Sequence, residues 1–89
     1  MGKSGKAMSQ VIRSPKQLGA LIQQARMQRS MSQKGLADLV GTYQKTISSI
    51  ENGSPGAKID TIFSLLAALN LDLELAPRRK SSVKLDEIF

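Results

Sequence analysis

Residues 32–53 read SQKGLADLVGTYQKTISSIENG, and this stretch decides the fold. An apolar pattern led by Leu36 runs at helical spacing up to Gly41. After the glycine, Ile47 and Ile50 lie three positions apart and so share one helix face. Gly41 tolerates the positive φ that the end of a helix often requires. Two short helices joined by such a tight turn predict a helix-turn-helix motif.

A further helix is predicted before this motif. Ser14 is a good N-cap, Pro15 suits the first helical position, and Gln17 completes a pattern that resembles a capping box. The helix is expected to run to about Arg29. Its buried stripe is predicted to consist of Leu18, Leu21, Ile22 and Ala25.

A fourth helix is predicted over residues 59–70. Its apolar residues give it a wide face for the core, on which we expect Phe63 to be buried. The residues of this face are Ile59, Ile62, Phe63, Leu65, Leu66 and Leu69.

The sequence LDLEL at residues 71–75 alternates leucines with carboxylates, as a half-buried strand does. A single strand cannot form a sheet, so this one needs a partner. The partner is either the segment Val11–Ile12 or the same strand of a second subunit, which would make a two-fold dimer. The other interpretation is an extended segment packed on the fourth helix. In the dimeric interpretation, the strand residues are Leu71, Leu73 and Leu75.

The composition argues against an enzyme. The 89 residues contain no histidine and no cysteine, which removes the commonest general base and the commonest metal ligands. A glycine-rich phosphate loop and clustered carboxylates are also missing. We therefore expect no catalysis, no cofactor and no metal. The longest apolar run, residues 62–69, is too short to span a bilayer. With no secretory signal pattern at the N-terminus, a cytoplasmic, nucleoid-associated location is expected.

The charge is unevenly distributed along the chain. The net charge is +6, and residues 1–58 hold nine basic and two acidic residues. This excess favours binding to a polyanion through counterion release, although it also serves solubility. DNA is the favoured polyanion, because the few aromatic residues do not form the stacking set that RNA recognition uses.

The second helix of the motif carries a polar face. Glutamine pairs with adenine N6 and N7, and lysine pairs with guanine O6 and N7, so this face suits the edges of base pairs in the major groove. The alternative is an ordinary solvated face. The residues of this face are Gln44, Lys45, Ser48 and Ser49.

The pattern SQxxLAxxxGxxxxTISxIENG over residues 32–53 resembles the Xre family, which includes the phage repressors and Cro proteins. This resemblance implies an all-α fold, a phage-repressor-like bundle of four to five helices, that binds palindromic operators as a dimer. By the same resemblance, Gln33 contacts phosphate and braces Gln44, and Asn52 contacts phosphate. Thr46 is expected to reach phosphate or to pack in the turn.

Two further positions are interpreted through the family. Tyr43 stands where the family usually has a capping Ser or Thr, so either Thr42 caps the helix or the cap is weak. Tyr43 is instead expected to contact the sugar-phosphate backbone. Arg26 and Glu51 resemble an ion pair that ties the first helix to the third, and we interpret them as structural.

The longer outline of the chain resembles the HipB subgroup, through SPKQLGALIQQAR and NGSPGAKIDTIFSLLAALNLDLEL. This resemblance implies an antitoxin that represses its own operon and binds a HipA-type toxin kinase. The alternative is a stand-alone Xre-type regulator. Three parts are expected: a flexible arm (1–13), a DNA-binding and dimerisation domain (14–76) and a flexible tail (77–89). The tail ends in apolar residues that would dock a partner, unless the tail is simply solvated. These docking residues are Val83, Leu85, Ile88 and Phe89.

Overall fold

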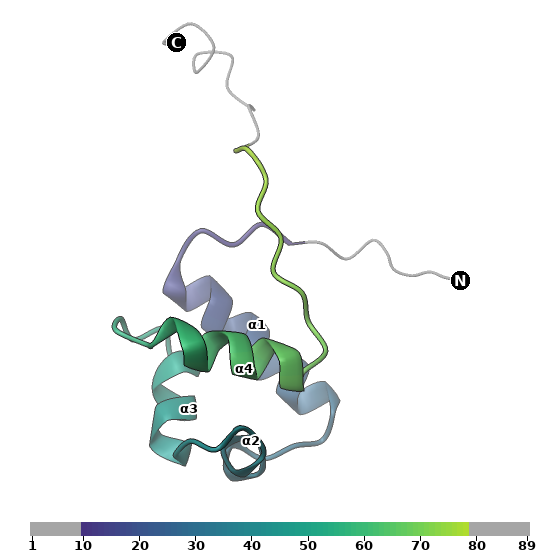
Figure 1. Ribbon diagram of the computed structural model, residues 1–89, viewed down its shortest axis with the longest axis vertical. Coiled ribbons are helices and arrows are strands. Elements are labelled where there is room, and N and C mark those ends of the chain that lie inside the picture. The colour runs from purple at the N-terminus through teal and green to yellow at the C-terminus, as the bar shows by residue number, and fades with distance from the viewer. Residues whose placement is uncertain (1–9, 79–89) are drawn as a thin grey trace, which may run out of the picture.

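The computed structural model describes residues 10–78, which contain four α-helices. The short helices α2 and α3 lie at one end of the bundle, with α1 behind and α4 in front (Figure 1). This confirms the all-α fold and the helix-turn-helix. The helices are α1 (Pro15–Gln28), α2 (Gln33–Val40), α3 (Gln44–Glu51) and α4 (Ile59–Ala68). The predicted docking residues Val83, Leu85, Ile88 and Phe89 lie outside the described residues, as does most of the predicted N-terminal arm.

The start of α1 is fixed by local hydrogen bonds, as the sequence predicts. The Ser14 hydroxyl accepts a hydrogen bond from the Gln17 backbone N–H at 3.1 Å. In return, the Gln17 side-chain oxygen accepts from the Arg13 backbone N–H at 2.6 Å. Together these bonds satisfy two backbone donors that a helix N-terminus otherwise leaves to water.

The turn between α2 and α3 begins at a left-handed glycine. Gly41 has φ +79°, and its N–H donates to the carbonyl of Ala37, which closes α2. Tyr43 is the N-cap residue of α3 and forms no side-chain capping bond. The alternative that Thr42 caps this helix is therefore wrong. Packing against the neighbouring helices, rather than a cap, must fix the start of α3.

The core lies where the four helices meet. α3 packs against both α1 and α2, and α4 packs against α2. Each helix supplies at least one fully enclosed side chain, so every helix is anchored from inside the bundle. The largest of these are Ile22, Leu36, Ile47, Leu65 and Leu69.

Two residues of α4 were expected in the core and lie outside it. Phe63 is 50% exposed and Ile59 is 67% exposed, so their predicted burial is wrong. At 3.6 residues per turn, Ile59 and Phe63 form their own stripe, about a third of a turn from the one that contains Leu65 and Leu69. Only the latter stripe faces the core, because α4 is covered on one side alone.

The predicted strand at residues 71–75 is not confirmed. Residues 10–78 contain no strand, and Val11–Ile12 does not pair with this segment. The segment leaves the end of α4 and runs away from the four helices (Figure 1). Leu71 packs against the core, whereas Leu75 is 92% exposed. A strand is defined by hydrogen bonds to a neighbouring strand, and no segment within residues 10–78 pairs with this one in that way.

A larger side chain at Ala37 should destabilise the motif, because only 1% of this residue is exposed. The residue is buried in the core cluster beside Leu36 and Ile47. We expect Ala37→Leu to lower the free energy of unfolding by about 1–3 kcal/mol, because the added methylenes have no space. Urea unfolding followed by circular dichroism measures this change. A variant that unfolds at the parent's midpoint would show that α2 and α3 are not closely packed here.

Candidate nucleic-acid interface

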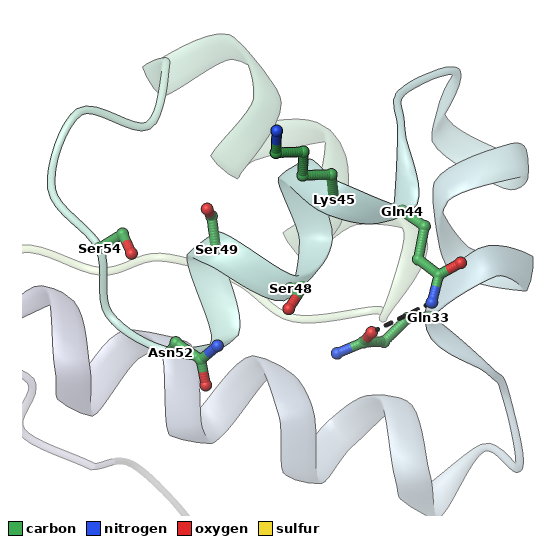
Figure 2. Close-up of a pocket in the computed structure, with 7 residues that line it drawn as sticks. All are labelled: Gln33, Gln44, Lys45, Ser48, Ser49, Asn52 and Ser54. Carbon is green, nitrogen blue, oxygen red and sulfur yellow. Dashed lines mark hydrogen bonds between the residues drawn. The ribbon is translucent and has the colours of Figure 1, made fainter.

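The outward face of α3 carries the residues that are predicted to contact base edges. Gln44, Lys45 and Ser49 are exposed, and Ser48 is half-buried. They line an open hollow of about 410 Å³ together with Gln33 of α2 and two residues that follow α3. Figure 2 shows Gln33 and Gln44 at one end of this hollow and Ser54 at the other. The residues that complete the lining are Asn52 and Ser54.

Ser54 is not among the residues predicted from the sequence, because it lies in a loop with no helical pattern to place it. Its backbone N–H donates to the carbonyl of Ser49 at 3.0 Å, which folds the loop back against the end of α3. A backbone bond of this kind leaves no signal in the sequence. The hydroxyl of Ser54 thus adds a hydrogen-bonding group beyond the predicted set.

A second hollow, of about 460 Å³, runs between α3 and the loop that leads to α4. Tyr43, 78% exposed, lines it with the half-buried Thr46 and the exposed Lys58. Lys45 borders both hollows. Tyr43 and Thr46 thus lie on a different side of α3 from Gln33 and Asn52.

A buried ion pair joins the end of α3 to α1. Arg26 Nε lies 2.6 Å from Glu51 Oε2, and Arg26 Nη2 donates to Glu51 Oε1 at 3.0 Å. Arg26 Nη1 also donates to the carbonyl of Met31 at 2.7 Å. The hydrogen bond to Glu51 raises the pKa of Arg26 above its usual value, so the guanidinium stays charged. The two residues thus have the structural contact that the resemblance implies.

The ion pair continues into the candidate interface through two glutamines. Gln33 Nε2 donates to Glu51 Oε1 at 3.0 Å. Gln44 Nε2 in turn donates to Gln33 Oε1 at 3.5 Å, the longest bond of the series (Figure 2). The structure therefore brings Gln33 and Gln44 together, as the resemblance implies. The bond from Gln33 to Glu51 was not anticipated.

The helix α1 approaches the end of α3 very closely at Gly19. A Cβ built on Gly19 would lie 2.2 Å from the carbonyl oxygen of Ile50 and 2.7 Å from that of Glu51. The sequence carries a weak signal for this contact, since glycine inside a helix is unfavourable and needs a packing reason. Gly19 thus sets the distance between α1 and the end of α3.

The chemistry of the two hollows suits a polyanion with hydrogen-bonding edges. Their lining offers amides, hydroxyls and the ammonium groups of Lys45 and Lys58, and neither hollow is lined by a carboxylate. Cations of this kind favour phosphates, and amides can read base edges. In residues 10–78, no group of three His, Cys, Asp or Glu side chains is placed to hold a metal ion. No helix in the same range is both long and apolar enough to cross a membrane.

These features define a helix-turn-helix protein, and comparison with known proteins agrees. Residues 22–75 match the family model described as helix-turn-helix. Antitoxin HipB of Escherichia coli strain K12 is 34% identical over 73 residues, covering 82% of this chain and 83% of that protein. An uncharacterised HTH-type transcriptional regulator of Sinorhizobium fredii is 33% identical over 76 residues, covering 82% of this chain and all of that protein.

Solved structures show the same relationship. HipB in a HipA–HipB–O2–O3 complex superposes with a TM-score of 0.73 and 34% identity over 80% of this chain and all of that one. HipB in an O4 20mer complex gives the same TM-score, identity and coverage. The chain therefore belongs to the helix-turn-helix family, in the group that contains the HipB antitoxins.

Proposed function

We propose that this protein is a dimeric, sequence-specific repressor that binds a palindromic site in double-stranded DNA. The observation that carries the proposal is the outward polar face of α3, held rigidly by α1 and α2 and free of carboxylates. A rigid helix of this kind fits the major groove, where base pairs present distinct patterns of donors and acceptors. Phosphate contacts supply most of the affinity, and base contacts supply the sequence choice.

The residues divide between these two tasks by position. Gln44 and Lys45, at the start of α3, with Ser48 and Ser49, are proposed to read base edges. The others are proposed to contact phosphates, with Gln33 at the N-terminus of α2, where free backbone N–H groups favour an anion. The proposed phosphate contacts are Gln33, Tyr43, Thr46, Asn52 and Lys58.

The dimer is proposed to form through residues 71–75. Leu73 is half-exposed and Leu75 almost fully exposed in the single chain, which supports a role in covering a second copy. A symmetry-related strand would supply the hydrogen bonds that this segment lacks. Two α3 helices related by a two-fold axis then read half-sites about one helical turn apart.

We further propose that the protein is the antitoxin of a HipBA-type module, represses its own operon and binds a HipA-type toxin kinase. The HipB relatives and the HipA–HipB–O2–O3 complex support this proposal. A stand-alone regulator is the alternative, and the Sinorhizobium fredii relative is consistent with it.

The toxin proposal is tested by purifying the full chain from its native cells, beside a variant lacking residues 83–89. Recovery of a kinase-like partner only with the full chain would support an antitoxin with a contact in its tail. Recovery of the partner with both forms would place the contact elsewhere. Recovery of DNA with no protein partner from either form would favour the stand-alone regulator.

One substitution on α3 and one at the N-cap of α4 should separate base reading from phosphate binding. Gln44→Ala is expected to weaken the preference for one base pair in each half-site. The free energy of binding to the selected site alone should lose about 1–3 kcal/mol per contact. Lys58→Ala, which removes only a proposed phosphate contact, is expected to weaken binding to all DNA sequences alike. It should also reduce the slope of log affinity against log salt concentration by about 1. Fluorescence anisotropy on the selected site and on scrambled DNA measures both effects. Equal losses on the two DNAs for Gln44→Ala would count against base reading.

A further inference from the structure

We propose that Glu51, although buried and out of reach of DNA, is a positioning residue that orients Gln44 for adenine. It acts through Gln33, so that a structural ion pair also sets the base preference of the recognition helix. This inference rests on the proposed function, because it concerns how the reading residue is held. Four hydrogen bonds carry it: two from Arg26 to Glu51, one from Gln33 to Glu51 and one from Gln44 to Gln33.

The first step is the chemistry of the buried carboxylate. Glu51 is only 6% exposed, and Arg26 fixes it with bonds to both oxygens. An ionised carboxylate accepts hydrogen bonds and cannot donate one. Whatever neighbours it must therefore present a donor, and Gln33 does so with its Nε2 at 3.0 Å. The Gln33 amide thus has one allowed orientation, with its Oε1 turned away from Glu51.

The second step transfers this orientation to α3. Gln33 Oε1 faces Gln44, and only the NH₂ side of the Gln44 amide can meet it, which it does at 3.5 Å. The opposite orientation would place two carbonyl oxygens against each other. Figure 2 shows the two amides facing one another across the start of α3, with the oxygen of Gln44 pointing away from Gln33.

The third step is the match to a base. Gln44 donates only one of its own two N–H groups to Gln33. Its carbonyl oxygen and its other N–H therefore remain free for a ligand. Adenine presents the complementary pair in the major groove, a donor at N6 and an acceptor at N7. Guanine presents two acceptors, N7 and O6, and would leave the Gln44 carbonyl unpaired. The fixed amide therefore favours adenine over guanine.

The test compares two double variants that differ in one group. In Arg26→Met/Glu51→Met, no acceptor remains for Gln33. In Arg26→Met/Glu51→Gln, the new side-chain oxygen still accepts from Gln33, and neither variant leaves a buried charge unpaired. Each variant and the wild-type chain are used to select sites from a random DNA duplex library. The affinities for sites with adenine and with guanine at the base pair that Gln44 is proposed to contact are then compared.

We expect wild-type protein to prefer adenine to guanine at one position per half-site by about tenfold or more. The preference should fall below about threefold in the Met/Met variant and return only in part in the Met/Gln variant, because an amide can donate as well as accept and so fixes Gln33 less strictly than a carboxylate does. A purely structural role of the ion pair would change stability and leave this ratio alone. An unchanged ratio in folded Met/Met protein would overturn the proposal. Failure of the wild-type chain to select any sequence would instead contradict the proposed function itself.

A second measurement uses the wild-type chain and does not depend on any variant folding. Nitrogen-15 relaxation reports the motion of each glutamine side-chain amide, and Gln23 and Gln24 on the exposed side of α1 are internal references. The proposal predicts that the amides of Gln33 and Gln44 are more ordered than both references. If they are as mobile as Gln23 and Gln24, the orientation is not fixed and the proposal fails.

Discussion

Replacement of Arg26 by methionine is expected to lower the free energy of unfolding by about 3–5 kcal/mol. The loss is large because Glu51, 6% exposed, would then be a buried charge without its cationic partner. Gln33 would remain as a single neutral donor to the carboxylate. Small domains are stable by only about 5–15 kcal/mol, so the variant should unfold at a clearly lower temperature and urea concentration than the parent. Urea or thermal unfolding followed by circular dichroism measures the change.

The matched control for this prediction is Arg26→Met/Glu51→Met. A buried ion pair replaced on both sides by apolar residues of similar volume is often neutral, because no charge is left to desolvate. The double variant should therefore be more stable than the single one, even though it carries more changes. If the double variant were the less stable of the two, the cost would come from lost packing and not from the unpaired carboxylate.

A comparably large effect is expected for Gly19→Ala, a change of a single methyl group. The new Cβ would lie 2.2 Å from a backbone oxygen at the end of α3, and a backbone cannot turn aside as a side chain can. Helix α1 must then move away from α3, which also strains the ion pair between them. We expect a loss of about 3 kcal/mol, at the upper end of the range for overpacking, in spite of the better helix propensity of alanine. Urea unfolding of this variant beside the parent measures the loss.

Gly35→Ala is the control for that experiment. Gly35 also lies inside a helix, but a Cβ there meets only the hydroxyl of Ser32, at 3.1 Å. The gain in helix propensity of about 0.5–1 kcal/mol should therefore dominate, so this variant should be as stable as the parent or more stable. If both variants gained stability, the close approach of α1 to α3 would be disproved.

The local features of the fold could be predicted because they depend on neighbours in the sequence. The cap at Ser14 and the turn at Gly41 each follow from residues within a few positions. The burial of Phe63 could not be predicted, since it depends on which side of α4 the rest of the bundle covers. The pairing of residues 71–75 could not be settled for a similar reason, because a strand exists only with a partner.

The features of the candidate interface also divide into those that the sequence could predict and those that it could not. The polar face of α3 follows from helical spacing, so Gln44, Lys45 and Ser49 could be placed on it from the sequence. The contact of Gly19 with α3 and the bond from Gln33 to Glu51 join segments far apart in the chain. Such contacts depend on the packing of whole helices, and a single sequence does not specify that packing directly.

Sequence reading by α3 is tested most directly by measuring how the chain binds to DNA sites selected from a random duplex library, over a range of salt concentrations. We expect a palindromic site with half-sites about one helical turn apart, bound by two copies of the chain. Affinity should fall linearly with salt on a logarithmic scale, and scrambled DNA should bind much more weakly. Equal affinity for selected and scrambled DNA at every salt concentration would contradict the claim that α3 reads sequence.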